Sequence, residues 1–235
     1  MTESKAWDWT VVKGDGETHW TTPMSEAYYL AHRWLSQDKT EFLDLGTGLG
    51  RHAIFFARQG FKTSAIDLSE ESIKRAGEWA AAENLTIDFT TGDMLKLPYA
   101  DASFDCIVCR NVIGHQDTKG VMQAFSEIHR ILKPDGEVFI TVGSKSTWGW
   151  SQDWPQVDAN TKLRDEEGPE YMVPHFYADE DLIPELCEGF KIVSMVHAQH
   201  YWPNPYPGSQ YTPVEKTLGL THGGWHFEIL MKKIG

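Results

Sequence analysis

Hydrophobic residues along most of the chain follow two rhythms, one typical of buried strands and the other of amphipathic helices. Short apolar runs predict strands, and apolar residues that recur every three to four positions predict helices. The predicted strands are residues 42–45, 63–67, 86–91, 104–110, 137–142, 190–197 and 225–232, and the predicted helices are 25–36, 51–59, 70–84, 119–132 and 178–187. Because strands and helices alternate with short connections, we expect an α/β fold with a mostly parallel sheet and helices on both faces.

Local signals mark several ends of these elements. Ser25 and Ser69 precede two of the helices and are expected to cap them. Gly60 is expected to end the helix at 51–59 in the left-handed conformation. Residues 133–136, with the sequence Lys-Pro-Asp-Gly, predict a turn before the strand at 137–142.

The regular alternation stops after Gly143. Residues 144–177 and 198–224 are rich in Trp, Tyr, Pro and Gly, and long irregular segments of a compact domain are usually functional. Two interpretations of their aromatic residues stay open. The tryptophans Trp148, Trp150, Trp154, Trp202 and Trp225 either cover the core or form a cap that shapes a pocket for a small acceptor.

Composition narrows the class of protein. The chain has 235 residues, 41% of them hydrophobic, and a net charge of −13, which disfavours nucleic-acid partners. Its three cysteines, Cys106, Cys109 and Cys187, give no disulfide framework and fit a reducing cytoplasm. The N-terminus resembles no secretory signal and no run of about 18 apolar residues occurs, so we expect a cytoplasmic protein without a membrane partner, either a monomer or a homodimer.

A glycine-rich turn at residues 46–50 joins the strand at 42–45 to the helix at 51–59. Glycines let the backbone pass close to a ligand, and in open α/β sheets ligands bind beyond the carboxyl ends of the strands. The spacing is Gly-x-Gly-x-Gly, and Arg51 stands where the dinucleotide fingerprint requires its third glycine. The turn therefore predicts a ligand site that differs from the usual dinucleotide site.

Acidic residues follow the next two strands. Asp67 stands where a carboxylate can accept both hydroxyls of a ribose, and Ser69 already occupies the capping position that Asp67 would otherwise fill. Asp93, in the segment Gly-Asp-Met, either reads the edge of an adenine or is a solvated loop residue.

These segments, in their order and spacing, resemble the class I methyltransferases that depend on S-adenosylmethionine (SAM). The matching strings are LDLGTGLGR (43–51), AIDLS (65–69), TGDMLKLP (91–98), FDCIVCRNVIGH (104–115) and ILKPDGEVFIT (131–141). Residues 50–76 are similar to small-molecule methyltransferases of the tellurite-resistance-like and ubiquinone-biosynthesis-like groups. The resemblance implies a Rossmann-like three-layer sandwich whose seven-stranded sheet ends in an antiparallel strand, with aromatic-rich inserts after strands 5 and 6. It also implies one domain, with a cap region at 1–40, a cofactor-binding core at 41–143 and a substrate-side part at 144–235.

The resemblance further implies a role for individual residues. Asp44 and the backbone of Gly46, Thr47 and Gly48 would hold the methionine end of SAM. Asp67 would bind the ribose, Leu68 would pack on the adenine face, and Asp93 and Met94 would contact the adenine edge. Asn111 would lie beside the transferring methyl group, and Arg51 either lies near the SAM carboxylate or covers the first helix turn.

Methyl transfer is an in-line displacement on an already activated methyl group, so alignment is the main requirement, and a base is needed only if the acceptor must lose a proton. We expect a small-molecule acceptor, with His115 or His175 as the candidate base and His19, His222 and His226 as further histidines of the flanking segments. No metal is expected, because Cys106 and Cys109 would face opposite sides of a strand. Two alternatives remain: a non-catalytic SAM-binding module and an NAD(P)-dependent oxidoreductase.

Overall fold

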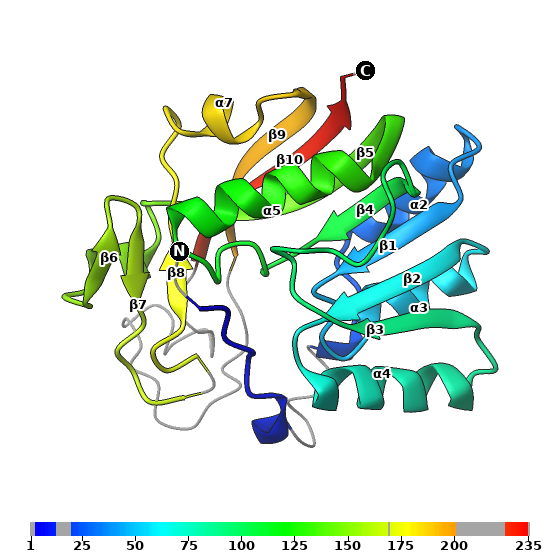
Figure 1. The fold of residues 1–235 in the computed structure, drawn as a ribbon, viewed down its shortest axis with the longest axis horizontal. Coiled ribbons are helices and arrows are strands. Elements are labelled where there is room, and N and C mark those ends of the chain that lie inside the picture. The colour runs from blue at the N-terminus through cyan, green and yellow to red at the C-terminus, as the bar shows by residue number, and fades with distance from the viewer. Residues whose placement is uncertain (1–2, 13–19, 169, 201–223, 235) are drawn as a thin grey trace.

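The fold is built on a large mixed sheet. The computed structural model describes residues 3–12, 20–168, 170–200 and 224–234. In these residues seven strands form one sheet in the order β3-β2-β1-β4-β5-β10-β9 (Figure 1). The strands are β1 (Glu41–Leu45), β2 (Lys62–Asp67), β3 (Ile87–Thr91), β4 (Phe104–Cys109), β5 (Leu132–Gly143), β9 (Phe190–His200) and β10 (Gly224–Lys233).

The first five strands are parallel, and β10 runs antiparallel to both of its neighbours, β5 and β9. This confirms the predicted Rossmann-like sheet with an antiparallel last strand. The helices are α2 (Glu26–Leu35), α3 (Arg51–Arg58), α4 (Glu70–Ala82), α5 (Thr118–Ile131), α6 (Trp148–Ser151) and α7 (Ile183–Leu186), with a 3-10 turn η1 (Trp9–Val11) near the N-terminus. None of the described helices is long and apolar enough to cross a membrane.

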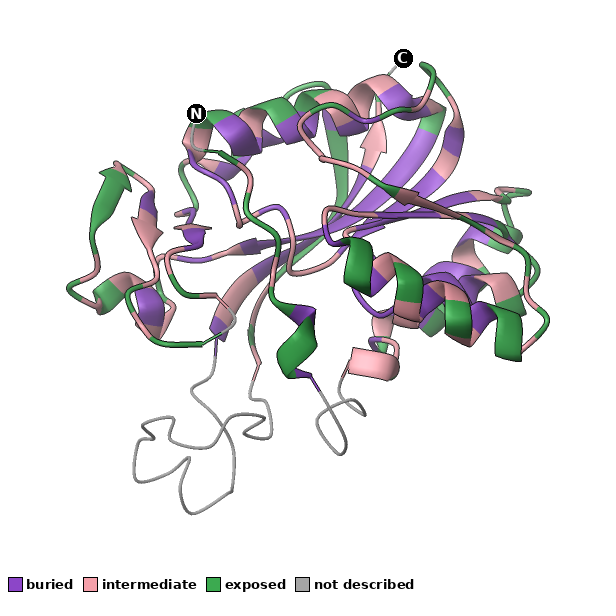
Figure 2. Cartoon of the chain, turned by 60° about the horizontal axis from the view of Figure 1, so that its bottom comes forward, coloured by how far each residue is buried: buried purple, intermediate pink, exposed green. Residues whose placement is uncertain are grey.

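Two hydrophobic cores lie on opposite faces of the sheet, and Figure 2 shows its strands buried between helices that expose their outer faces. One core joins α5 to the sheet, and the other joins α2 and α3 to it. Strand β4 contributes to both, because its side chains alternate between the faces. Cys106 therefore lies in the second core and Cys109 in the first, so the two thiols diverge as expected.

The insert after β5 contains a small antiparallel sheet. It consists of β6 (Gln156–Asp158), β7 (Thr161–Leu163) and β8 (Pro174–Phe176), and it stands at one end of the large sheet (Figure 1). The aromatic insert after strand 5 thus has secondary structure of its own. The predicted insert after strand 6 falls on residues 201–223, which lie outside the described residues, as does Trp202.

Some predicted boundaries are wrong, each for a local reason. The turn expected at 133–136 lies inside β5, where pairing with β4 jumps from Leu132 to Glu137 and leaves those four residues as an irregularity. The helix expected at 178–187 shrinks to Ile183–Leu186, because Ala178 pairs with Ser144 in a bridge and Pro184 favours a helix start beside it.

Three expected helix ends can be compared directly. Ser69 caps α4 by accepting a hydrogen bond from the Ser72 amide, and Gly60 follows α3 with φ +91°, both as predicted. Ser25 does occupy the N-cap position of α2, but its hydroxyl donates to Glu26 instead of capping the helix.

Candidate active site

A cavity of about 1200 Å³ opens at the carboxyl ends of the parallel strands. Its walls come from the ends of β1, β2 and β4, from the small sheet and from the N-terminal segment 4–11. Ligand pockets usually enclose roughly 300–1,000 Å³, so this cleft has room for a cofactor and a second molecule. We call the part beside β1–β3 the cofactor half and the part beside the small sheet the acceptor half.

The glycine-rich turn forms one wall of the cofactor half. Gly46 and Gly48 have φ values of +74° and +54°, in the left-handed region that favours glycine. A Cβ on Gly46 would come within 2.2 Å of Val112, and one on Gly48 within 2.6 Å of the Trp9 ring. Glycine is therefore needed at both positions for its backbone conformation and for close packing.

The amide groups of this turn are already used inside the protein. Gly46 and Thr47 both donate to the carbonyl oxygen of Ile66, and Gly48 donates to the Asp67 carboxylate at 2.8 Å. The amides of Gly46, Thr47 and Gly48 are thus engaged and do not point at a ligand as free donors. Carbonyl oxygens are what the turn can offer, and these suit a bound ammonium better than a phosphate.

Asp44 lies behind this wall and does not line the cavity. Its side chain is 1% exposed and accepts hydrogen bonds from the Thr47 hydroxyl (2.6 Å) and from the Ala53 amide (3.0 Å) in the first turn of α3. Burial raises the pKa of the Asp44 carboxyl to about 6. Asp44 therefore holds the turn against the positive end of α3, and in this structure it does not face the cleft as the sequence had suggested.

Asp67 lines the cleft at the end of β2. One carboxylate oxygen accepts from the Gly48 amide and the other from the Ser69 amide, at 2.8 and 2.9 Å. Burial raises the pKa of the Asp67 carboxyl above its usual value. A carboxylate has about four acceptor sites, so two remain for hydroxyl groups of a ligand.

The other predicted cofactor residues come together around the same space. Leu68, Asp93 and Met94 line the cavity beyond Asp67, and the Asp93 carboxylate also accepts from the Leu95 amide at 2.9 Å. Asn111 follows β4 with φ +57°, a conformation that asparagine tolerates. Its backbone N–H donates a hydrogen bond to the Thr141 hydroxyl at 2.7 Å.

Two arginines bring positive charge between the two halves. Arg51 lines the cavity, lies 5.5 Å from the Trp20 ring centre, and has a pKa lowered to about 10 by burial. Arg110 forms a 3.0 Å ion pair with Glu228, whose carboxylate also lies 2.8 Å from His200. Arg110 is thus compensated within the protein.

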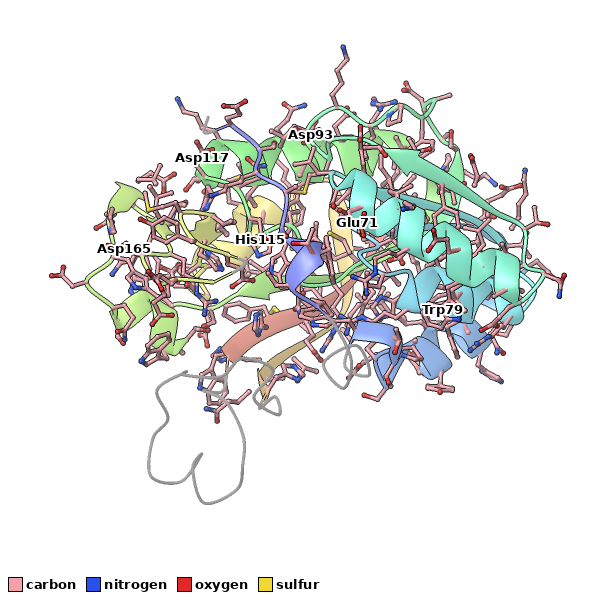
Figure 3. All side chains as sticks on the ribbon, turned by 90° about the horizontal axis from the view of Figure 1, so that it is seen from below. Glu71, Trp79, Asp93, His115, Asp117 and Asp165 are labelled. Carbon is pink, nitrogen blue, oxygen red and sulfur yellow. The ribbon has the colours of Figure 1, made fainter. Side chains whose placement is uncertain are left out.

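The acceptor half contains both candidate bases. His115, from the loop between β4 and α5, and His175, on β8, lie with ring centres 5.2 Å apart, and Figure 3 places His115 near the middle of the molecule beside the N-terminal segment. Burial lowers the pKa of His115 to about 4, so the ring is neutral at pH 7. His226 on β10 lines the cavity too, and burial likewise lowers its pKa to about 4. His19 and His222 lie outside the described residues.

Sequence reasoning missed Glu170 and Arg164. The two side chains form a close ion pair in the acceptor half, and Glu170 lies 3.7 Å from His115 and 3.4 Å from His175. Neither residue belongs to a recognisable motif. Only the folding of the small sheet brings them beside the histidines, so no local pattern could have identified them.

The N-terminal segment spans the cleft. The Lys5 ammonium donates to the Tyr171 carbonyl at 2.6 Å and the Trp7 indole donates to Glu170 at 3.2 Å, on the acceptor side. On the cofactor side, Arg75 of α4 donates to the Trp9 carbonyl at 2.9 Å. The segment thus links both halves and narrows the opening of the cavity.

Comparison with known sequences supports a methyltransferase relationship. Residues 42–136 match the family described as a methyltransferase domain. A methyltransferase of Geobacillus sp. (strain WCH70) is 33% identical over 132 residues, which are 52% of this chain and 53% of that protein. A malonyl-[acyl-carrier protein] O-methyltransferase of Pectobacterium atrosepticum is 30% identical over 123 residues, 52% of this chain and 46% of that protein. The chain spans about half the length of the curated relatives that it matches.

Solved structures share the fold over nearly the whole chain. A SAM-dependent methyltransferase of Methanosarcina mazei superposes with a TM-score of 0.69 and 22% identity, covering 87% of this chain and 97% of that one. A 1,6-didemethyltoxoflavin-N1-methyltransferase of Burkholderia thailandensis, with bound 1,6-didemethyltoxoflavin and S-adenosylhomocysteine, gives 0.60 and 20%, covering 97% and 86%. Residues 42–136 thus match a methyltransferase-domain family, and the described chain shares the fold of solved SAM-dependent methyltransferases.

Proposed function

We propose that this protein transfers the methyl group of SAM to a small-molecule acceptor. The observation that carries the proposal is the single cavity, which joins a glycine-turn wall with Asp67 to an acceptor half with its own polar and aromatic side chains. A cofactor-sensing module without an acceptor would have no need of the second half.

The residues of the cofactor half fit SAM in charge and shape. Asp67 has acceptor sites left for the ribose hydroxyls, and Leu68 offers an apolar surface for adenine, with Asp93 and Met94 at its edge. The carbonyl oxygens of Gly46 and Gly48 suit the methionine ammonium, and we assign Arg51 to the methionine carboxylate. Asn111, beside β4, would lie near the methionine part.

The same wall disfavours a dinucleotide. Pyrophosphate binding in Rossmann folds uses free amides of the glycine-rich turn and the open N-terminus of the following helix. Here Gly46, Thr47 and Gly48 donate within the protein, and the Asp44 carboxylate already accepts from the first turn of α3. An NAD(P)-dependent reaction would therefore lack its main phosphate donors.

The acceptor half favours a small, partly apolar molecule with a polar group. Trp148, Trp154 and Tyr177 line it, and Glu170, His115 and His175 supply polar atoms among them. The acceptors named for two of the relatives, a malonyl-[acyl-carrier protein] and 1,6-didemethyltoxoflavin, differ from one another. We extend to this chain only that the acceptor is not a nucleic acid, which its net charge of −13 would repel.

SAM supplies a methyl group that its positive sulfur has already activated. The protein's own contribution would be to align the acceptor atom, and the aromatic wall and the N-terminal segment would exclude water. An acceptor that must lose a proton needs a base, and His115 and His175 are the candidates. In both rings the Nε2 atom faces Glu170 and can bind either a proton or a metal ion.

We also propose a cytoplasmic location. The buried cysteines Cys106, Cys109 and Cys187 carry free thiols, which suits a reducing compartment.

The first test is turnover. The full chain is incubated with SAM and sets of small alcohols, amines, thiols and carboxylic acids, and S-adenosylhomocysteine is quantified. Acceptor-dependent release supports the proposal, and a large loss of turnover in a His115→Ala or His175→Ala variant shows that the reaction depends on that imidazole. Binding of S-adenosylhomocysteine without turnover on any acceptor class would favour a non-catalytic SAM-binding module instead.

A further inference from the structure

Three side chains in the acceptor half converge from two separate stretches of the chain. His115 comes from the loop after β4, His175 from β8, and Glu170 from the loop before β8. One potential ligand atom from each lies within 4.8 Å of the other two. The chain thus gathers two imidazoles and one carboxylate at one point of the cleft wall.

The ring of His175 is oriented as a metal-binding imidazole usually is. Its Nδ1 lies 3.0 Å from the Val173 carbonyl oxygen, which can only accept, so Nδ1 carries the hydrogen. When the ring is neutral, its Nε2 atom carries a lone pair that faces the Glu170 carboxylate at 3.4 Å. Two acceptors facing each other repel unless a positive charge lies between them. Metal-binding histidines characteristically donate their other N–H to a carbonyl or a carboxylate in this way.

The His115 ring also faces the Glu170 carboxylate, and a single proton cannot lie between Glu170 and both rings. Its Nε2 lies 3.7 Å from the other oxygen of Glu170, too far for a hydrogen bond. An imidazole binds a metal ion through a ring nitrogen that carries no proton, and Nε2 of His115 can serve in this way in the neutral ring. A proton on His175 would serve that ring alone, whereas a cation among the three groups would serve both rings and the Glu170 carboxylate, which also accepts from the Trp7 indole and pairs with Arg164.

The local charge leaves room for that cation. Arg164 pairs with both Glu170 and Glu166, so one positive charge stands against two negative ones. The two imidazoles add no charge when neutral. The cluster therefore carries a net charge of −1 before any ion binds, even with Arg164 present.

We propose that His115, Glu170 and His175 form a binding site for a divalent transition-metal ion of the zinc class. Two nitrogens and one carboxylate oxygen are a ligand set of catalytic zinc sites, whereas Mg²⁺ and Ca²⁺ prefer oxygen alone. Metal–ligand bonds of about 2.0–2.2 Å place tetrahedral ligand atoms roughly 3.4 Å apart. The side chains need to close by about 1 Å from their present separation, which rotation about their side-chain bonds permits.

The consequence for the reaction rests on the proposed function. The remaining coordination positions would face the cleft, where an acceptor oxygen, nitrogen or sulfur could bind the ion. Binding to the ion makes a hydroxyl or thiol more acidic, so its proton would be lost to solvent more readily. With the ion bound, His115 and His175 are ligands and do not act as bases.

The test uses the tag-free full chain after treatment with a chelator. Zn²⁺ is titrated by calorimetry, and Co²⁺ is titrated with visible absorption as a probe of its coordination. We expect one tightly bound ion per chain in the wild type. His115→Ala, His175→Ala and Glu170→Gln should each weaken binding by at least about 100-fold, beyond the roughly 10–100-fold effect of losing an outer partner.

Two control variants separate this site from surface binding. His32→Ala removes an exposed histidine of α2, and Asp88→Asn removes an exposed carboxylate of β3 that does not line the cavity. Both should bind Zn²⁺ within a fewfold of wild type. S-adenosylhomocysteine binding by every variant reports whether the fold survives.

The outcomes distinguish this inference from the proposed function. Absence of stoichiometric Zn²⁺ and Co²⁺ binding, or binding unchanged in the three ligand variants, overturns the metal site and leaves methyl transfer standing. Site-specific metal binding in a protein that never turns over SAM keeps the metal site and rejects the proposed activity.

Discussion

Replacing Asp67 by Asn tests the cofactor assignment most directly. The carboxylate holds the Gly48 and Ser69 amides and keeps about two acceptor sites for ribose hydroxyls. Asparagine offers one oxygen and turns an NH₂ group toward a donor, so both roles are damaged. A hydrogen bond to a charged group contributes about 1.5–3 kcal/mol, which corresponds to a roughly 10- to 150-fold loss of affinity.

The assay is calorimetric titration of S-adenosylhomocysteine into wild type, Asp67→Asn and Asp88→Asn. Asp88 is an exposed acid on the neighbouring strand β3 and does not line the large cavity, so its variant should bind as wild type does. Thermal unfolding of each protein checks the loss of the two backbone contacts separately. If Asp67→Asn remains folded and binds S-adenosylhomocysteine within twofold of wild type, Asp67 only holds the Gly48 and Ser69 amides and the ribose assignment is refuted.

Three further predictions follow from the packing of the same region and of the sheet. Gly48→Ala should lower the free energy of unfolding by about 1–2 kcal/mol because of its left-handed backbone, and by a further amount because the new Cβ would clash with Trp9. Gly60 is also left-handed but has open space around it, so Gly60→Ala should show only the backbone cost when both variants are unfolded in urea. Burial raises the pKa of Asp44 to about 6, so its ionisation should lower the free energy of unfolding by roughly 3 kcal/mol as pH rises from about 4 to 6. Asp44→Asn should remove this fall when unfolding curves are compared at pH 4 and pH 7. Glu137 is buried and accepts two hydrogen bonds from Arg33 and one from the Trp34 indole, so Glu137→Ala should cost about 3–5 kcal/mol, and Glu137→Gln less, in chemical denaturation.

Each of these predictions has a contradicting result. Equal costs for the two glycine variants would mean that Trp9 does not pack on Gly48 in solution. A pH dependence that survives in Asp44→Asn would assign the fall to another group. A loss below about 1 kcal/mol for Glu137→Ala would mean that its partners find other acceptors.

The cofactor half was largely predictable because its residues are close in sequence to strand ends. Gly46, Gly48 and Asp67 follow β1 and β2 directly, and parallel strands deliver their carboxyl ends to one edge of the sheet. The exception is Asp44, which lies within β1 and whose side chain points away from the cleft, toward the N-terminus of α3. Alternation along a strand gives two possible faces, and the packing of α3 decided between them.

The acceptor half could not be predicted at the level of contacts. His115 and His175 were identified as candidates, but their meeting with Glu170 depends on how the small sheet packs against the loop after β4. The small sheet itself has no periodic signal, because its three-residue strands are too short to repeat. The part of the N-terminal segment that spans the cleft has no such signal either.

The sequence by itself determined the α/β architecture, the mostly parallel sheet and the position of the cofactor half. These depend on hydrophobic periodicity and on glycines and acids at strand ends, which are local properties of the chain. Only the tertiary structure decided which side chains share the acceptor half and that the N-terminal segment links both sides of the cleft. The contacts His115–Glu170 and Lys5–Tyr171 join residues 55 and 166 positions apart, and their energies depend on three-dimensional packing that no local pattern records.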